Sequence, residues 1–257
     1  MQKHEKTLFL VTSALNVPSK NMEEKLRARL HDTLSTINSI NCHFKDCEIW
    51  LLESSFKKPM KKYLSMFPKN LKIVDFWSDD KILGFHSKAM KYEAKNKLRY
   101  YTPGKEDLDD SFLYLGYVKN RTESYVLSKV FREMDMSKFD RVFKLSGRYC
   151  LQPTFDVKPH LTEDAAVFGE KIKSNQGTIK NIDYIYLCYL WSFPIKIKKE
   201  ITEMIVNVEK EVKDYLKENR IIDMEHSIYN NLRNIKVKEL KKLQTYAKIN
   251  AELHSFF

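Results

Sequence analysis

LFLVTSA, residues 8–14, is an apolar run that closes on small polar residues, and its recurrence along the chain indicates the fold class. The pattern returns in EIWLLESS at residues 48–55, and a third apolar run, LKIVDF, spans residues 71–76. Between the first two runs lie residues 23–40, whose apolar side chains recur every three or four positions, as in an amphipathic helix. Short apolar strands that alternate with helices predict an α/β fold with a mainly parallel sheet.

The polar ends of these strands predict where a ligand binds. In open parallel sheets, ligands lie beyond the carboxyl ends of the strands. The first strand closes on Thr12–Ala14 and the second on Glu53–Ser55. We therefore expect these two polar ends to share one rim of the sheet.

The middle of the chain continues the alternation of helices and strands. Thr122 is expected to cap a helix over residues 123–134. A strand follows at residues 139–145, and runs rich in apolar and aromatic residues predict later strands at 165–169 and 184–191. These elements extend the predicted sheet beyond its first three strands.

The C-terminal part of the chain has a different pattern. From residue 196 onward, two apolar stripes with helical spacing predict helices, and the second stripe consists of Val237, Leu240, Leu243, Tyr246 and Ile249. We accordingly divide the chain into a core at residues 1–195 and a helical C-terminal extension at residues 196–257 that packs on the core.

Composition narrows the class of protein. The 257 residues, 43% of them hydrophobic, suffice for one domain with its own core. A net charge of +11 favours an anionic partner, whether nucleotide phosphates, nucleic acid or an acidic membrane surface, or reflects only a lysine-rich solvated surface. The chain has no Gly-x-Gly-x-x-Gly, P-loop or Gly-x-Ser-x-Gly motif, which disfavours dinucleotide, P-loop and serine-hydrolase functions.

Cysteines and hydropathy indicate a cellular compartment. The four cysteines form no Cys-x-x-Cys pair, so we expect reduced thiols of a cytoplasmic protein rather than a zinc site or a disulfide framework. No stretch reaches the ~20 apolar residues of a membrane span. We expect a soluble protein, and a basic amphipathic tail leaves peripheral contact with the inner membrane surface open.

A family resemblance emerges when two further segments are added. TESY at residues 122–125 opens a predicted helix, and FKLSGRY at residues 143–149 lies at a strand-to-loop turn. Together with the two polar strand ends, these segments resemble bacterial and viral sugar transferases of the nucleotide-diphospho-sugar transferase (GT-A) superfamily, over roughly residues 7–195. The resemblance implies a GT-A-like (Rossmann-like), mixed, mainly parallel sheet flanked by helices, and sugar transfer from a nucleotide-sugar donor to a glycan or lipid-linked acceptor.

The resemblance also implies which residues hold the donor. The first strand's end would hold the base and ribose, and Glu53 would accept hydrogen bonds from the nucleoside, unless it is a solvated strand end or a helix cap. The donor-binding residues implied in this way are Thr12, Ser13, Ala14, Glu53, Ser54, Ser55, Glu123, Lys144, Ser146, Gly147 and Tyr149.

One feature departs from the family pattern. Most GT-A enzymes carry an Asp-x-Asp after the central strand that binds a divalent metal, whereas here the strand closes on KLSGRY. The nearest literal match, Asp107-Leu108-Asp109, follows a Pro-Gly-Lys sequence and is interpreted as a solvated acidic run. We expect a metal-independent site in which Arg148, with Lys144, stabilises the leaving diphosphate. Manganese or magnesium as a cofactor, and a purely structural Arg148, remain alternatives.

Sugar transfer with inversion needs a base that deprotonates the acceptor hydroxyl. The segment IDMEHSIY at residues 222–229 opens a predicted helix, and related transferases often place the base at such a helix start. Asp223 and Glu225 are the candidates, with His226 in support. The structural alternative is that Asp223 caps the helix and Glu225 favours its positive end.

Two rival functions stay open at this point. The first is a basic nucleic-acid-binding protein, although the lysines are dispersed and no recognition module is visible. The second is an inactive GT-A-like scaffold that binds a partner through its C-terminal helices. Separately, the tail at residues 236–257 could pack on a second subunit of a homodimer instead of on the core.

Overall fold

The structure is a computed structural model that describes residues 5–16, 22–69, 71–93, 110–162, 164–174, 183–218, 221–249 and 252–255. At its centre lies a seven-stranded sheet with the strand order β10-β6-β9-β4-β1-β2-β3. Its strands are β1 (Thr7–Ser13), β2 (Glu48–Glu53), β3 (Lys72–Asp75), β4 (Arg141–Ser146), β6 (Ala166–Gly169), β9 (Leu190–Pro194) and β10 (Val237–Leu240).

The direction of the strands confirms the predicted fold class. β3, β2, β1 and β4 are neighbours that all run parallel, and β10 runs parallel to β6. β9 is antiparallel to both β4 and β6, which makes the sheet mixed but mainly parallel.

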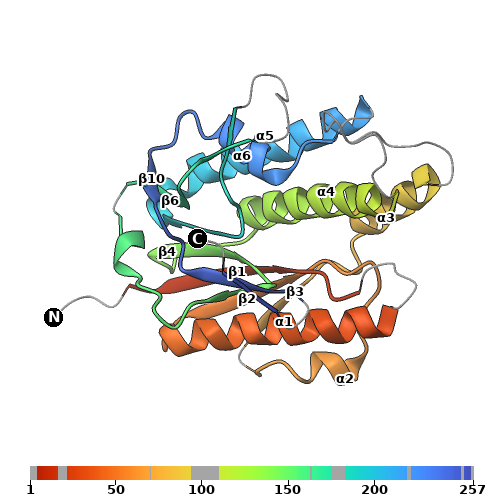
Figure 1. Cartoon of the computed structure of the whole chain (residues 1–257), viewed down its shortest axis with the longest axis horizontal. Coiled ribbons are helices and arrows are strands. Elements are labelled where there is room, and N and C mark those ends of the chain that lie inside the picture. Colours follow the sequence, from red (N-terminus) through yellow and green to blue (C-terminus); the bar gives the residue numbers. More distant parts are fainter. Residues whose placement is uncertain are drawn as a thin grey trace.

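Helices cover both faces of the sheet (Figure 1). They are α1 (Met22–His43), α2 (Lys61–Leu64), α3 (Asp80–Glu93), α4 (Asp110–Glu133), α5 (Lys198–Lys217) and α6 (Met224–Asn231). α1 and α2 lie on one side of the sheet, and α3, α4, α5 and α6 lie on the other (Figure 1).

The alternation of side chains along β1 explains these two layers. Successive residues of a strand point to opposite faces, so Phe9 and Val11 join the core under α1 and α2, whereas Leu8 and Leu10 join the core under α3 to α6. All four side chains are fully buried. A strand covered on both faces requires a continuous apolar run, which is the pattern that opens the sequence.

Two smaller sheets flank the main one. β5 (Tyr149–Leu151), β11 (Thr245–Ile249) and β12 (Glu252–Ser255) form the first, in the order β12-β11-β5. β7 (Ile172–Lys173) and β8 (Tyr184–Ile185) form an antiparallel pair. Short 3₁₀ turns at Lys158–His160 and Ile195–Ile197 join neighbouring elements.

Two predicted boundaries are wrong. α4 begins at Asp110, so Thr122 is a buried residue inside the helix rather than its cap. The predicted strand at residues 184–191 is interrupted, because β8 ends at Ile185 and β9 begins only at Leu190. In both places the local sequence favours the observed structure type, and the tertiary contacts decide its extent.

The predicted second helix of the C-terminal extension is also wrong. Residues 237–240 form β10, which hydrogen-bonds to the edge of β6, and residues 245–249 form β11, which pairs with β5. Between them Gln244 has a φ of 52°, a left-handed conformation that no helix tolerates. Unpaired edges on β6 and β5 offer backbone hydrogen bonds that outweigh the weak helical pattern of this segment.

The expectations about membrane spans and about cysteines can be compared with the described residues. Within the residues described, no helix combines the length and apolar character needed to cross a membrane. The four cysteines are free, with Cys42 exposed and Cys150 and Cys188 buried.

Candidate functional site

The carboxyl ends of β1, β2 and β4 meet at one rim of the sheet. In the parallel register, Ser13 lies opposite Glu53 on β2, and Thr12 lies opposite Ser146 on β4. The shared rim that the strand ends predict is therefore confirmed. It brings the TSA and ESS ends together with the KLSGRY turn.

Gly147 joins the KLSGRY turn tightly to the end of β1. Its N–H donates to the carbonyl of Thr12 over 2.9 Å. A Cβ atom at this position would lie 2.9 Å from that same backbone oxygen, so a larger residue would require the backbone to move. The glycine thus allows close approach of two chain segments and places the exposed Arg148 next to Thr12.

A buried ion pair lies at the same rim. Lys144 Nζ lies 2.6 Å from Glu123 Oε1 of α4, and it also donates to Ser146 Oγ at 2.9 Å and to the carbonyl of Cys188 at 2.8 Å. Thr12 Oγ1 donates to the same Glu123 oxygen over 3.3 Å. An ammonium group has three N–H donors, and all three are used here. The contacts of Lys144 therefore do not support the expectation that it meets a donor phosphate.

Burial on its own would raise the pKa of Glu123, but the positive charges of Lys144 and Lys119 outweigh burial and hold that pKa below its usual value. Glu123 is thus a charged carboxylate that its neighbours neutralise. It joins α4 to the ends of β1 and β4.

Glu53 is fully buried at the end of β2. Its Oε1 accepts hydrogen bonds from the backbone N–H groups of Leu15 and Ser55, each over 3.0 Å, and from Ser55 Oγ. Ser55 Oγ in turn accepts from the N–H of Asn16 over 2.7 Å. Burial raises the pKa of Glu53, against the effect of these hydrogen bonds.

This arrangement matches neither alternative weighed for Glu53, since the side chain is not solvated and caps no helix. Ser54 is also nearly buried and donates from its hydroxyl to the carbonyl of Ser13 over 2.9 Å. Glu53, Ser54 and Ser55 therefore hold the loops after β1 and β2 in place from the inside. Thr12 and Ala14 are the partly exposed members of the β1 end, whereas Ser13 is buried.

Two arginines from different elements lie near one another at the rim. Arg29 of α1 donates from Nη1 to the carbonyl of Ala14 over 2.9 Å. Burial, together with the positive charge of Arg148, lowers the pKa of Arg29 to about 10, against the opposing effect of Glu53 and Asp32. Burial raises the pKa of Asp32, and the neighbouring His31 and the charges of Arg148 and Arg29 oppose that rise. The rim therefore carries two cations whose mutual repulsion the nearby carboxylates only partly offset.

A second charged group faces this rim from α4 and α6. The charge of Glu225 is the largest influence that raises the pKa of the exposed Lys119, and Glu123 and Asp223 act in the same direction. Burial raises the pKa of Glu225, opposed by Lys119 and reinforced by the carboxylates of Asp223 and Glu123.

Tyr149 is influenced by charges from both parts of the rim, Arg148 on one side and Lys119 with Glu225 on the other. Burial raises the pKa of its hydroxyl, and the charges of Arg148, Lys119, Glu225 and Glu123 all influence it. Its ring stacks on Tyr189, with centroids 4.5 Å apart. The structure thus places Arg148, Glu123, Tyr149, Glu225 and Asp223 in one electrostatic neighbourhood, although they come from the KLSGRY turn, α4 and α6.

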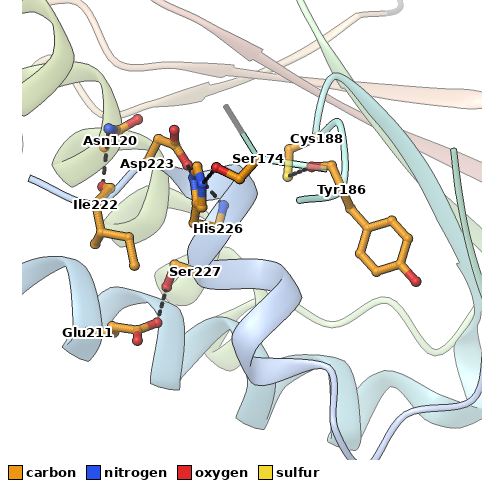
Figure 2. Close-up of polar contacts among 9 residues, drawn as sticks. All are labelled: Asn120, Ser174, Tyr186, Cys188, Glu211, Ile222, Asp223, His226 and Ser227. Carbon is orange, nitrogen blue, oxygen red and sulfur yellow. Dashed lines mark hydrogen bonds and ion pairs between the residues drawn. The ribbon is translucent and has the colours of Figure 1, made fainter. Parts of the chain in front are cut away.

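His226 is buried beside Asp223, and both of its ring nitrogens have side-chain partners. It is 1% exposed, and its ring lies between Asp223, with Nδ1 to Oδ1 at 2.5 Å, and Ser174, with Nε2 to Oγ at 2.7 Å (Figure 2). Asp223 is the N-cap of α6, because its side chain accepts a hydrogen bond from the N–H of His226 over 2.9 Å. The cap expected as the structural alternative for Asp223 is confirmed, and it leaves other roles of the carboxylate open.

The carboxylates of the site do not resemble a metal centre. Within the described ranges, no group of three or more His, Cys, Asp or Glu side chains could hold a metal ion. Glu123 already forms an ion pair with Lys144 at 2.6 Å, and the positive charge of Lys119 acts on Glu225. These residues do not fit manganese or magnesium. The Asp107-Leu108-Asp109 run lies outside the described residues.

Sequence reasoning missed three residues that the structure adds to the site. Arg29 and Lys119 lie on helices and resemble ordinary solvated positions in the sequence, and Ser174 follows a two-residue strand. Their partners lie far along the chain: 15 residues separate Arg29 from Ala14, and 52 separate Ser174 from His226. No local pattern reports such contacts, so only the packing of α1, α4 and α6 could have revealed them.

Comparisons with known proteins give a likeness in fold only. No protein-family model and no curated protein matches the sequence. An active-site mutant of LgtC resembles the structure with a TM-score of 0.47 and 10% identity, over 90% of this chain and 72% of that one. The glycosyltransferase GlyE of Streptococcus pneumoniae TIGR4 has a TM-score of 0.44 and 12% identity, over 93% of this chain and 46% of GlyE, so this chain spans about half of it.

A third similar solved structure is named as a synthase rather than as a glycosyltransferase. 4-Diphosphocytidyl-2C-methyl-D-erythritol synthase of Anaerococcus prevotii has a TM-score of 0.40 and 15% identity, over 92% of this chain and 86% of that one. At these identities the comparisons assign no activity to the chain, and its chemistry must be argued from its own residues.

Proposed function

We propose that this chain is a GT-A-type glycosyltransferase that moves a sugar from a nucleoside-diphosphate donor to a glycan or lipid-linked acceptor. One observation carries the proposal. A pair of arginines at the carboxyl ends of parallel strands lies in the same electrostatic neighbourhood as a carboxylate of raised pKa at the start of α6. The first feature suits a diphosphate, and the second suits a base.

The donor is proposed to bind along the end of β1. Thr12 and Ala14 are partly exposed there and would face the nucleoside. Arg148 and Arg29 would bind the diphosphate, because a guanidinium group forms parallel hydrogen bonds to phosphate oxygens. Their mutual repulsion adds to this preference, since a bound anion between two like charges lowers the electrostatic energy of both.

The buried polar residues of the rim are proposed to position this site rather than to contact the donor. Glu53 and Ser55 hold Leu15 and Asn16 directly after β1, and Gly147 holds the KLSGRY turn against Thr12. Lys144 and Glu123 anchor the same strand ends to α4. Such internal support keeps charged groups at fixed distances, which electrostatic stabilisation of a leaving group requires.

Glu225 is proposed as the general base. Its raised pKa brings a carboxylate closer to the pH at which it accepts a proton efficiently. In a direct displacement, the acceptor oxygen attacks the anomeric carbon, its proton passes to Glu225, and the sugar–phosphate bond breaks. The departing nucleoside diphosphate takes the bonding electrons, and Arg148 and Arg29 stabilise its added charge. The positive charge of Lys119 opposes this rise in the pKa of Glu225.

Thermal-shift titration tests the donor site. UDP, GDP, CDP and CMP are titrated against the wild-type protein with and without a chelator, since a ligand that binds only the native state raises the melting temperature. We expect at least one nucleotide to raise it, and the chelator to leave this effect intact. Arg148→Ala and Arg29→Ala should each weaken binding about tenfold or more, the equivalent of about 1.5–3 kcal/mol for a charged hydrogen bond.

Arg132→Ala is the matched control, because Arg132 is an exposed arginine at the far end of α4. It should bind the nucleotide as the wild type does. The proposal fails if none of the four nucleotides shifts the melting temperature. It also fails if Arg148→Ala and Arg132→Ala bind with equal affinity.

A further inference from the structure

Ser174, His226 and Asp223 form a continuous chain of side-chain hydrogen bonds (Figure 2). Ser174 Oγ lies 2.7 Å from His226 Nε2, and His226 Nδ1 lies 2.5 Å from Asp223 Oδ1. Both ring nitrogens are thereby occupied, one by a hydroxyl and the other by a carboxylate. This is the order of groups by which a histidine withdraws the proton of a serine and a carboxylate stabilises the resulting imidazolium.

Helix capping alone does not account for this arrangement. The cap of α6 requires only that Asp223 accept the N–H of His226, which it does over 2.9 Å. The imidazole ring could then lie in any direction. Instead the ring is 1% exposed and bonds to Ser174, which follows β7 and lies 52 positions earlier in the chain.

The start of α6 is held rigidly on two sides (Figure 2). Asn120 of α4 donates to the carbonyl of Ile222 over 3.3 Å, directly before the cap. Ser227 donates to Glu211 of α5 over 2.6 Å, directly after His226. The histidine and its carboxylate therefore keep one orientation, as a group that exchanges protons with a serine must.

Ser174 is the accessible end of this series of hydrogen bonds. Ser174 is partly exposed, whereas His226 is buried. Ile172, two residues before Ser174 in the chain, is a large apolar side chain that is 42% exposed. An exposed apolar side chain of this kind suits the acyl part of an ester.

We propose that Ser174 is an activated nucleophile that takes the acyl group of a carboxylic ester, with His226 as its base and Asp223 as the residue that orients the histidine. Ser174 Oγ attacks the ester carbonyl carbon, and its proton passes to His226 Nε2. The alcohol leaves with that proton when the ester C–O bond breaks. Water then attacks the acyl-serine, gives a proton to His226, and releases the carboxylic acid as the proton returns to Ser174.

This activity goes beyond sugar transfer and does not depend on it, although Asp223 belongs to both neighbourhoods. The sequence disfavours a serine hydrolase because the Gly-x-Ser-x-Gly motif is absent. That motif marks one fold's nucleophile turn, whereas the same three groups occur on unrelated folds and are recognised by geometry.

A fluorophosphonate probe with a fluorescent tag tests the proposal, because it reacts with activated serines. The Oγ–P bond forms, fluoride leaves, and the serine proton passes to the histidine. We expect the full-length wild-type protein to be labelled, with mass spectrometry placing the adduct on Ser174. Ser174→Ala should lose about a hundredfold in labelling and in hydrolysis of 4-nitrophenyl acetate.

Ser65→Ala is the matched control, since Ser65 is an exposed serine whose hydroxyl donates only to a backbone carbonyl, that of Lys62. It should be labelled as the wild type is. Equal labelling of Ser174→Ala and wild type, an adduct on another residue, or no labelling of the wild type overturns the proposal. Nucleotide-induced thermal shifts should be unchanged in Ser174→Ala, so that failure here and failure of the donor site are separate results.

Discussion

Lys144 Nζ lies 2.6 Å from Glu123 Oε1, and this buried contact joins the end of β4 to α4 at the rim where β1 also ends. Both side chains carry little exposed surface, 2% for Lys144 and 13% for Glu123. A charge in such a place is tolerated only when its partner remains. The pair therefore supports the site through stability rather than through contact with a ligand.

Replacing Lys144 should be costly. Lys144→Met leaves Glu123 buried without its closest cation, and we expect a loss of about 3–5 kcal/mol in the free energy of unfolding. Urea denaturation measures this loss. Lys138→Met is the matched control, because Lys138 lies at the same 2.6 Å from Glu48 but is 59% exposed. That exposed pair should contribute only about 0–1 kcal/mol. Similar losses in the two variants would contradict the role assigned to burial.

Two glycines should respond oppositely to the same substitution. Gly147→Ala introduces a Cβ atom 2.9 Å from the carbonyl of Thr12, so we expect a loss of about 1–3 kcal/mol and weaker nucleotide binding as the turn moves. Gly84 lies within α3, and a Cβ atom there meets nothing within 4 Å. Gly84→Ala should stabilise the protein by about 0.4–1 kcal/mol, because alanine has the higher helix propensity. If the melting temperatures of both variants rose, or both fell, the claim that the KLSGRY turn requires a glycine at 147 would be refuted.

Glu53 should give the stability of the protein a particular pH dependence. Burial raises its pKa above the ordinary value of 4.5, so the folded protein binds this proton more tightly than the unfolded chain does. The contribution of Glu53 to stability is therefore fully present below pH 4.5 and is lost as the pH rises through the folded-state pKa.

Glu53→Gln should remove this pH dependence while keeping an oxygen that accepts from Leu15 and Ser55. The measurement is urea denaturation at a series of pH values. Glu133→Gln, at an exposed position at the end of α4, is the control and should follow the wild-type curve. A Glu53→Gln curve parallel to that of the wild type would show that the folded-state pKa is not raised.

The pH profile of sugar transfer should identify the base. Glu225 must be ionised to accept a proton, so the wild-type rate should fall as the pH decreases through its raised pKa. Glu225→Gln should lower kcat by about 10²–10⁴-fold and remove the acidic limb of the profile. Nucleotide affinity should change little, because the proposed donor site lies at Arg148 and Arg29. If Glu225→Gln kept both the wild-type kcat and the acidic limb, the general base would have to be another group.

The strand ends show what local pattern can predict. Residues 8–14 and 48–55 predict buried strands with polar ends, and the parallel register then forces those ends onto one rim. Asp223 likewise predicts a helix start three residues before His226, and it is the cap in the structure. In each case the information lies within a few neighbouring residues, where periodicity and capping chemistry act.

The C-terminal segment shows where local pattern misleads. Its apolar residues at 237, 240, 243, 246 and 249 recur every third position and predict a helix, yet residues 237–240 and 245–249 form strands. Each of these segments completes an edge of a sheet formed much earlier in the chain. A short segment with a weak helix propensity becomes a strand where a neighbouring sheet edge offers it backbone hydrogen bonds.

The α/β alternation, the polar strand ends and the cap at Asp223 can be derived from the amino-acid sequence, because each depends on residues close together in the chain. The packing of the fold is needed to show that Lys144 faces inward to Glu123, that the charges of Arg29 and Arg148 interact, and that His226 contacts Ser174. These contacts join positions 21 to 119 residues apart. Which charged side chains stay solvated and which are buried with a partner depends on how the layers pack, and that is a property of the whole fold.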